Sequence, residues 1–158
     1  MIAPRGTFQE GAGYTFFKRR FDRSIPTAEV LALARNWVSH ELSLLLSASE
    51  KVVIAGYSSG AVYGESLLSV KPDWFAAAIL MRPEPLSANF AFPDLTGKPM
   101  LILAGKHDER RRPADAPRLA AQLEAAGAKV MLHTLDCGHG WASLDENLTL
   151  AHAWLTRI

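Results

Sequence analysis

The stretch KVVIAGYSSG, residues 51–60, decides the fold of this chain. Its first half is apolar and rich in β-branched residues, which is typical of a buried strand, and a helix-like stretch follows it. Its last five residues match the pattern Gly-x-Ser-x-Gly. Between a strand and a helix, this pattern predicts a sharp turn that holds the serine hydroxyl above the sheet. Glycines on both sides avoid side chains that would collide with the turn or block a substrate. Ser58 is therefore the first candidate nucleophile.

Apolar runs and helical patterns alternate along the rest of the chain. Strands are expected over Lys51–Tyr57, Phe75–Met81, Met100–Ala104 and Val130–Leu135. Helices are expected over Thr27–Ser47, Ser59–Val70, Pro113–Ala126 and Leu144–Leu155. Nearly continuous apolar strands suit a sheet that is buried on both faces. The alternation predicts an α/β fold with a doubly wound, mostly parallel sheet, in a single domain over residues 1–158.

The first helix and the segment before it carry more detailed expectations. Thr27 is expected to be the N-cap, and one apolar stripe is expected to be buried. That stripe consists of Val30, Leu33, Ala34, Trp37, Val38, Leu44 and Leu45. The segment from Gly11 to Arg23 mixes aromatic and basic residues and is expected to be a loop. Near the other end, Gly127 suits the C′ position of the third helix.

Composition and charge exclude several classes of protein. A net charge of +1 gives no overall field that would attract nucleic acid or an anionic membrane. Cys137 is the single cysteine, so no disulfide within the chain is possible, and a reducing compartment is indicated. The N-terminal residues lack the apolar stretch of a secretory signal, and no run is long enough to cross a bilayer. We therefore expect a cytoplasmic protein.

Two further residues complete a candidate catalytic triad. A serine nucleophile needs a base, and the base needs a third group to orient it. In α/β sheets, ligands bind at the carboxyl ends of the strands. Asp108 and His139 each lie four residues beyond an expected strand, and they follow Ser58 in the order Ser…Asp…His. Asp108 is the candidate acid and His139 the candidate base.

Other ionisable residues offer alternatives to this triad. The other loop acids are Asp94, Glu109 and Asp136, and Asp136 reads as a turn residue because it lies so close to His139. The remaining histidines, at positions 40, 107, 133 and 152, are expected to be structural or solvated. Cys137 is expected to be a small, buried or half-buried side chain. No spacing of Cys and His residues indicates a metal site.

Two basic groups, Lys18–Arg20 and Arg110–Arg112, lie in expected loops. Charge runs of this kind are usually solvated surface. The second group follows Asp108 directly, however, so it is also a candidate rim of the active site. In that position it would favour substrates that carry a carboxylate or a phosphate.

With these motifs in place, the chain resembles the carboxylesterase/phospholipase family of α/β-hydrolases, and above all its short bacterial esterases and hydroquinone-specific hydrolases. The matching stretches run over nearly the whole chain. They are residues 2–6, 16–19, 53–61, 78–83, 104–108 and 138–140. The resemblance implies Ser58 as nucleophile, Asp108 as acid and His139 as base.

The chain departs from the family pattern in three ways. Ser59 stands where relatives usually have Asn, and Arg110–Arg112 stand where a proline often follows the acid. Relatives also begin with a further strand, whose loop gives a backbone N–H to the oxyanion hole, before the strand that corresponds to Met1–Ala3. Of the oxyanion donors, the N–H of Ser59 remains identifiable. Loss of one such donor typically lowers kcat by about 100- to 1000-fold.

The missing strand would also change the edge of the sheet. Lys51–Tyr57 would become an apolar edge, unless Met1–Ala3 shifts to pair with it. An apolar edge strand invites pairing with another chain. We therefore expect either a homodimer formed through this edge or marginal solubility.

The resulting expectation is a serine hydrolase that cleaves small carboxylic esters, or thioesters, through an acyl-enzyme on Ser58 and without a cofactor. The alternative is a catalytically impaired or truncated relative that acts as a binding or interaction protein. The complete triad argues for the enzyme, and the missing oxyanion loop argues for the alternative.

Overall fold

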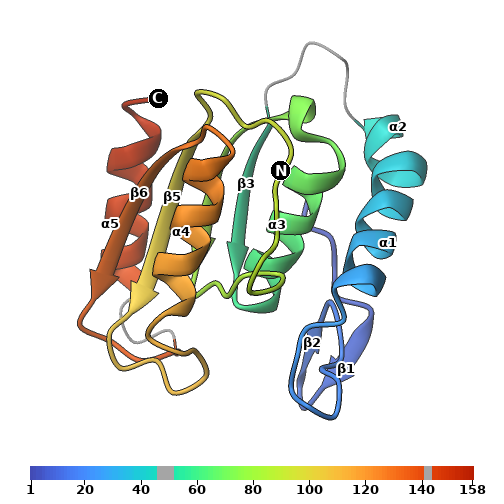
Figure 1. Ribbon diagram of the computed structural model, residues 1–158, viewed down its shortest axis with the longest axis horizontal. Coiled ribbons are helices and arrows are strands. Elements are labelled where there is room, and N and C mark those ends of the chain that lie inside the picture. The colour runs from blue at the N-terminus through green and yellow to red at the C-terminus, as the bar shows by residue number, and fades with distance from the viewer. Residues whose placement is uncertain (46–51, 141–143) are drawn as a thin grey trace.

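A four-stranded parallel sheet forms the centre of the computed structural model, which describes residues 1–45, 52–140 and 144–158. Its order is β3 (Val52–Tyr57), β4 (Phe75–Met81), β5 (Pro99–Gly105) and β6 (Lys129–Leu135). Each strand pairs in parallel with the next one along the chain. In Figure 1 the arrows of β3, β5 and β6 point in the same direction. The predicted parallel α/β sheet is therefore confirmed, and Lys51 lies outside the described residues.

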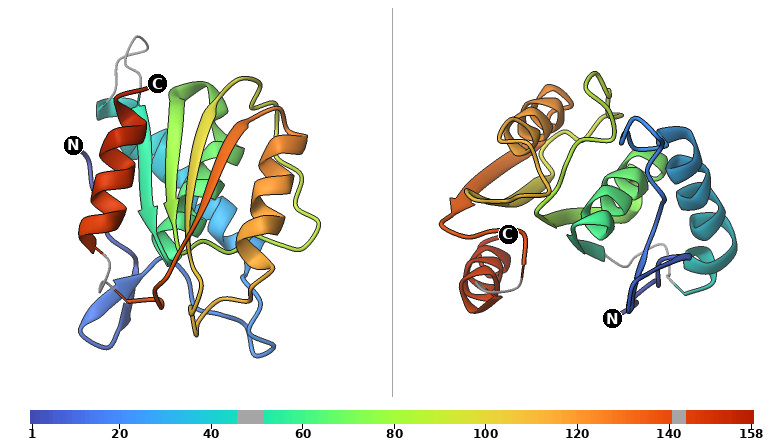
Figure 2. Two further views of the ribbon diagram at one scale, coloured as in Figure 1. Left: turned by 90° about the vertical axis from the view of Figure 1, so that its left-hand side faces the viewer. Right: turned by 90° about the horizontal axis from the view of Figure 1, so that it is seen from below.

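Helices cover both faces of this sheet. The helices α3 (Ser59–Val70) and α4 (Asp115–Ala125) lie on one face, and α1 (Thr27–Trp37) packs outside α3. The helix α5 (Leu144–Leu155) lies on the opposite face, as Figure 2 shows. A short 3₁₀ turn, Pro72–Trp74, leads from α3 into β4. Among the described residues, no helix is long and apolar enough to span a membrane.

The core has two parts, one on each face of the sheet. The larger part lies under α1, α3 and α4 and includes the fully buried Leu68, Leu80 and Leu119. The smaller part joins Trp154 of α5 to alternate residues of the central strands. Because β4 and β5 bury side chains on both faces, they read as continuous apolar runs.

The first predicted helix differs from the structure at both ends. Thr27 is the first helical residue and makes no cap; its hydroxyl donates to the Leu86 carbonyl at 2.6 Å. After α1 the chain makes a π-helical turn, Val38–Leu42, and then the short α2 (Ser43–Leu45). A π turn holds more residues than an α turn, so it rotates the side chains that follow. Residues 46 and 47 lie outside the described part.

The predicted apolar stripe is consequently wrong at its C-terminal end. Leu42 is buried, whereas Leu44 and Leu45 are 82% and 57% exposed. The other predicted boundaries agree with the structure to within two residues. Gly127 follows α4 with a φ of +89°, as its expected C′ position requires.

The N-terminal region holds a hairpin that the sequence interpretation missed. The strands β1 (Phe8–Glu10) and β2 (Gly13–Thr15) pair antiparallel, with Gly11 at a φ of +59° in the turn. The prediction of a loop from Gly11 onward is therefore wrong for β2. These strands are short and mostly exposed, so no apolar alternation marks them. In Figure 1 the hairpin lies at the carboxyl end of the sheet.

The first three residues form no strand. Met1 and Ile2 are exposed, and residues 1–6 have no regular structure. Within the described ranges, β3 pairs only with β4 and forms one edge of the sheet. We expected β3 either to be an open edge or to pair with residues Met1–Ala3. The structure has the open edge, with β3 unpaired on its outer side within the described ranges.

Candidate active site

Ser58 occupies a strained turn between β3 and α3. Its φ and ψ are +54° and −116°, a combination that is rare for a residue with a side chain. The Ser58 amide donates to the Met81 carbonyl at 2.9 Å, which fixes the turn against the next strand. This geometry holds the serine hydroxyl at the carboxyl end of the sheet.

The two glycines of the motif have different roles. A Cβ at Gly56 would lie 2.4 Å from the Gly60 carbonyl oxygen, so only glycine lets α3 start this close to β3. A Cβ at Gly60 would meet nothing nearer than a ring carbon of Phe16, at 3.7 Å. The expected collision with the turn therefore holds at Gly56 and is wrong for Gly60. The expectation that a side chain would block a substrate stays a prediction.

His139 follows β6 and reaches Ser58. Its Nε2 lies 2.9 Å from Ser58 Oγ, and the residue is only 5% exposed. The His139 amide donates to Glu109 Oε2 at 3.2 Å, and its carbonyl accepts from the Tyr57 hydroxyl. These two contacts anchor the backbone on both sides of the imidazole.

Asp108 follows β5 and faces the other imidazole nitrogen. Both of its carboxylate oxygens lie 2.9 Å from His139 Nδ1. A carboxylate in this position accepts a hydrogen bond from a protonated Nδ1. Nε2 then carries no proton and can accept the hydroxyl proton of Ser58. The structure thus brings together the three predicted residues, from three loops at the carboxyl ends of β3, β5 and β6.

The loops that carry Asp108 and His139 lie in close contact. A Cβ at Gly105 would come within 2.8 Å of the Cys137 carbonyl oxygen. Beneath this contact lies Arg82, which is 1% exposed and has a φ of +50°. Its guanidinium donates to the carbonyls of Leu103 at 3.1 Å and Gly138 at 3.2 Å.

Arg82 also reaches the face of the sheet that α5 covers. It donates to Asn147 Oδ1 of α5 at 3.0 Å and to Cys137 Sγ at 3.0 Å. The half-buried position of Cys137 agrees with the sequence interpretation. Arg82 therefore ties the loop that carries His139 to β5 and α5. Sequence reasoning missed this role, because an arginine at the end of a strand is usually a surface residue.

A second buried arginine contacts the nucleophile itself. Arg111 Nη2 donates to Ser58 Oγ at 3.1 Å, and Arg111 Nε donates to the Arg82 carbonyl at 2.8 Å. Its Nη1 lies 3.0 Å from Glu84 Oε1. Burial lowers the pKa of Arg111, and the Glu84 carboxylate opposes that shift. The side chain remains a cation, because an arginine pKa starts far above neutrality.

A cavity of about 580 Å³ opens beside these groups. Ser58, Ser59, Arg110 and Arg111 line it, whereas Arg112 does not. Arg110 and Arg111 of the group Arg110–Arg112 thus form part of the rim of the site. This agrees with the interpretation of that group as an active-site rim and not as solvated surface. Ser59 is the first residue of α3, and the first N–H groups of a helix have no acceptor within the helix. Its N–H therefore needs an acceptor from outside the helix, which a ligand in the cavity can supply.

The alternative acids and histidines take other roles. Asp136 pairs with His107 at 2.9 Å, on the surface, and this contact lowers the pKa of Asp136. Asp94 accepts hydrogen bonds from the backbone amide and hydroxyl of Thr96. Glu109 contacts the backbone of His139 and not its ring. In the described part of the chain, no three His, Cys, Asp or Glu side chains are placed to hold a metal ion.

The chain is similar to known hydrolases. No family model matches the chain. The chain is 27% identical over 142 residues to a protein of Bacillus subtilis strain 168 named "Putative hydrolase MhqD", and the match covers 88% of this chain and 71% of that protein. Solved structures share the fold as well.

Two of these structures are carboxylesterases. The enzyme from Mesorhizobium loti superposes with a TM-score of 0.83 at 27% identity, covering 96% of this chain and 73% of that one. The enzyme from Bacillus cereus superposes with a TM-score of 0.80 at 23% identity, covering 98% and 74%. The parallel sheet, the strained serine turn and these similarities lead to one conclusion: the chain has an α/β-hydrolase fold and is similar to carboxylesterases with that fold.

Proposed function

We propose that this chain is a serine esterase that cleaves small carboxylic esters, and thioesters as a close variant, through an acyl-enzyme on Ser58. The observation that carries the proposal is the relay from Ser58 Oγ to His139 Nε2 to Asp108, in which each contact measures 2.9 Å. The similarity to hydrolases and carboxylesterases supports ester hydrolysis as the reaction class.

The relay suggests the following sequence of steps. Ser58 Oγ attacks the carbonyl carbon of the ester while its proton passes to His139 Nε2. Asp108 accepts the Nδ1 proton in a hydrogen bond and stabilises the imidazolium that forms. The imidazolium then gives its proton to the departing alcohol, which leaves the acyl group on Ser58. Water, deprotonated by His139, attacks the acyl-enzyme and releases the acid, and the proton returns to Ser58.

The negative charge on the tetrahedral intermediate would face the start of α3. The Ser59 N–H lies at that helix end, and the helix dipole adds a partial positive charge there. A thioester follows the same path with a thiol as leaving group. Because a thiolate is a weaker base than an alkoxide, its departure depends less on the proton from His139.

The test compares hydrolysis of p-nitrophenyl acetate and butyrate by the chain and by its Ser58→Ala variant. We expect the variant to lose turnover to the background rate. Ser69→Ala is the matched control, because this hydroxyl lies on the same helix and donates to the Glu65 carbonyl at 2.9 Å. A fluorophosphonate probe, mapped by mass spectrometry, should label Ser58 in the unsubstituted chain. Equal rates from both proteins and no labelling, in folded samples, would contradict the proposal and favour a binding protein.

A further inference from the structure

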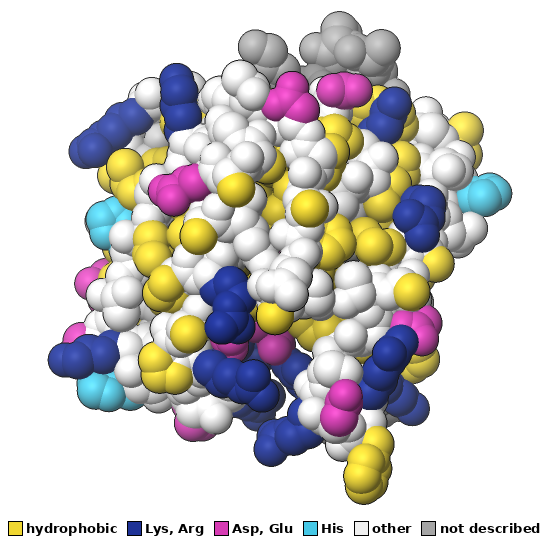
Figure 3. All heavy atoms as spheres, viewed as in Figure 1, with side chains coloured by type: hydrophobic (Ala, Val, Ile, Leu, Met, Phe, Trp, Pro, Cys, Tyr) yellow, Lys and Arg dark blue, Asp and Glu magenta, His cyan; other side chains and the backbone are white. Residues whose placement is uncertain are grey.

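The cavity beside Ser58 is far more positive than the chain as a whole. The net charge of the chain is +1, yet five Lys and Arg and only two Glu line this cavity. The cations are Lys18, Arg19, Arg23, Arg110 and Arg111. They come from two segments, the loop after β2 and the loop after β5. Figure 3 shows Lys and Arg side chains gathered around the hollow between these segments.

The inner cations share a single carboxylate. Glu84 Oε1 pairs with Arg111 at 3.0 Å and also with Arg19. One carboxylate between two guanidiniums leaves a surplus positive charge. The Arg111 side chain is only 9% exposed, so part of that charge is removed from water. An anion bound there would interact more strongly than on an open surface, because screening is weaker.

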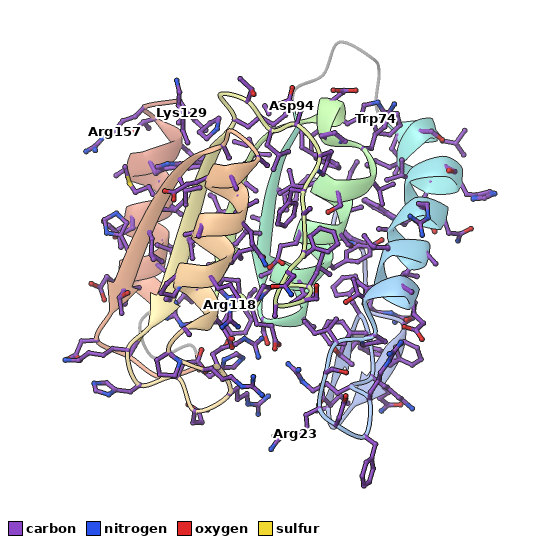
Figure 4. All side chains as sticks on the ribbon, in the orientation of Figure 1. Arg23, Trp74, Asp94, Arg118, Lys129 and Arg157 are labelled. Atoms are coloured by element: carbon purple, nitrogen blue, oxygen red, sulfur yellow. The ribbon has the colours of Figure 1, made fainter. Side chains whose placement is uncertain are left out.

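The outer cations are free to meet a ligand. Within the described residues, no carboxylate pairs with Lys18, Arg23 or Arg110. Lys18 lies over the Phe8 ring, 5.5 Å from its centre. Figure 4 places Arg23 at the open side of the hollow, next to the hairpin. Of the two Glu of the cavity, Glu109 is engaged by the His139 amide.

We propose that the substrate of this esterase carries an anionic group, a carboxylate or a phosphate, which binds among Arg23, Arg110 and Arg111 while the scissile carbonyl lies at Ser58. Guanidinium groups recognise both anions with paired, charge-assisted hydrogen bonds. Arg111 Nη2 is only 3.1 Å from Ser58 Oγ, which favours a short spacer between the anion and the ester. This inference deepens the proposed esterase function and rests on it.

Monoethyl succinate and ethyl butyrate test the preference directly. The two esters have the same acyl length and the same leaving group, and only the first carries a carboxylate. Hydrolysis is followed by proton release at constant pH and low ionic strength. We expect kcat/KM to be higher for monoethyl succinate than for ethyl butyrate. Added salt should reduce this ratio.

Charge variants then locate the anion. Arg110→Gln and Arg23→Gln should each lower the ratio of the two kcat/KM values by roughly tenfold, since a hydrogen bond to a charged group is lost. Arg157→Gln removes the same charge at the opposite end of the molecule, as Figure 4 shows, and should leave the ratio unchanged. Thermal unfolding of all three variants checks that they remain folded.

Binding gives a readout that does not depend on turnover. Titration calorimetry of the Ser58→Ala protein with succinate and with inorganic phosphate separates the two sources of anion. Binding that Arg110→Gln abolishes and Arg157→Gln preserves would support the subsite, and the tighter anion would identify the chemistry. Ester hydrolysis with equal kcat/KM for both esters, and no anion binding, would overturn the subsite and leave the esterase. Anion binding without any hydrolysis would overturn the esterase and leave the subsite.

Discussion

Asp108 holds the His139 imidazole through both of its carboxylate oxygens, and this contact decides which nitrogen carries the proton. Asp108→Asn presents an amide there and favours the wrong tautomer. We expect kcat for p-nitrophenyl butyrate to fall by roughly 10³- to 10⁴-fold, with little change in KM. Asp136→Asn is the matched control, because that acid pairs with His107 on the surface. A loss of less than tenfold in Asp108→Asn would contradict the assigned role.

Glu65 of α3 has a fully buried carboxylate. Among the described residues, neither oxygen has a hydrogen-bond partner of ordinary geometry. Burial raises the pKa of Glu65 well above its usual value, and the Leu86 amide opposes this shift to a lesser degree. The folded chain therefore keeps this proton at a pH where the unfolded chain has lost it. The contribution of Glu65 to the free energy of unfolding is fully present below the unfolded pKa of about 4.3. It decreases as the pH rises toward the folded pKa.

Glu65→Gln removes this titration while keeping the shape of the side chain. We expect the melting temperature of the variant, relative to the unsubstituted chain, to rise as the pH increases from the unfolded pKa toward the folded pKa of Glu65. The gain is on the order of 1 kcal/mol for each pH unit within the window, or a few degrees. Calorimetric melting curves of both proteins across this range provide the measurement. A difference that stays constant with pH would show that Glu65 does not titrate between the two states.

Single residues of the site differ in how far the sequence predicts them. Ser58, Asp108 and His139 were predicted to meet because each follows a strand and parallel strands end at one edge. Their proximity agrees with the structure, and their roles stay predictions. Arg82 and Arg111 could not be predicted in the same way. Arg82 lies 21 residues from Leu103 and 65 from Asn147, and Arg111 lies 53 residues from Ser58; no spacing rule links such positions.

Gly56 shows how the elements β3 and α3 depend on one another. An added Cβ would lie 2.4 Å from the Gly60 carbonyl oxygen and 2.8 Å from Ala61 Cα, both of them backbone atoms. Gly56→Ala must therefore move the start of α3 and the strained turn that holds Ser58. We expect a loss of about 1–3 kcal/mol in the free energy of unfolding and a fall of at least 100-fold in kcat.

The matched variant is Gly60→Ala, whose Cβ would meet a ring carbon of Phe16 at an ordinary 3.7 Å. Chemical denaturation of both variants measures the difference in stability. Gly60→Ala should unfold close to the unsubstituted chain, because an alanine fits there and suits a helix. If both variants unfold alike, the close contact at Gly56 does not limit the fold.

The elements of the sheet were easier to predict than the N-terminal segment. The strands β4 and β5 are buried on both faces, so their apolar runs identify them without tertiary information. The β1–β2 hairpin contributes little to the core, so its sequence carries no such pattern. The π turn after α1 could not be predicted from the sequence either, because an analysis of helical periodicity assumes a constant number of residues in each turn.

Across the whole molecule, the two edges of the sheet differ in protection. The outer strand β6 carries Lys129 and His133 among its seven residues. The opposite edge strand, β3, has no charged residue in Val52–Tyr57, and Val53 is 39% exposed. Native sheets protect their edges with charged residues, above all lysine. By this criterion β3 is the edge that is open to pairing.

We propose that two copies of this chain associate through β3. Light scattering after size exclusion should show a dimer whose fraction grows with protein concentration. Val53→Lys places a charge on this edge and should shift the sample toward monomer. Met131→Lys makes a comparable change on β6, where Met131 is 42% exposed, and should leave the dimer intact. A monomer at every concentration, or equal behaviour of the two lysine variants, would rule out association through β3, because only a contact at that edge makes the assembly sensitive to residue 53 alone.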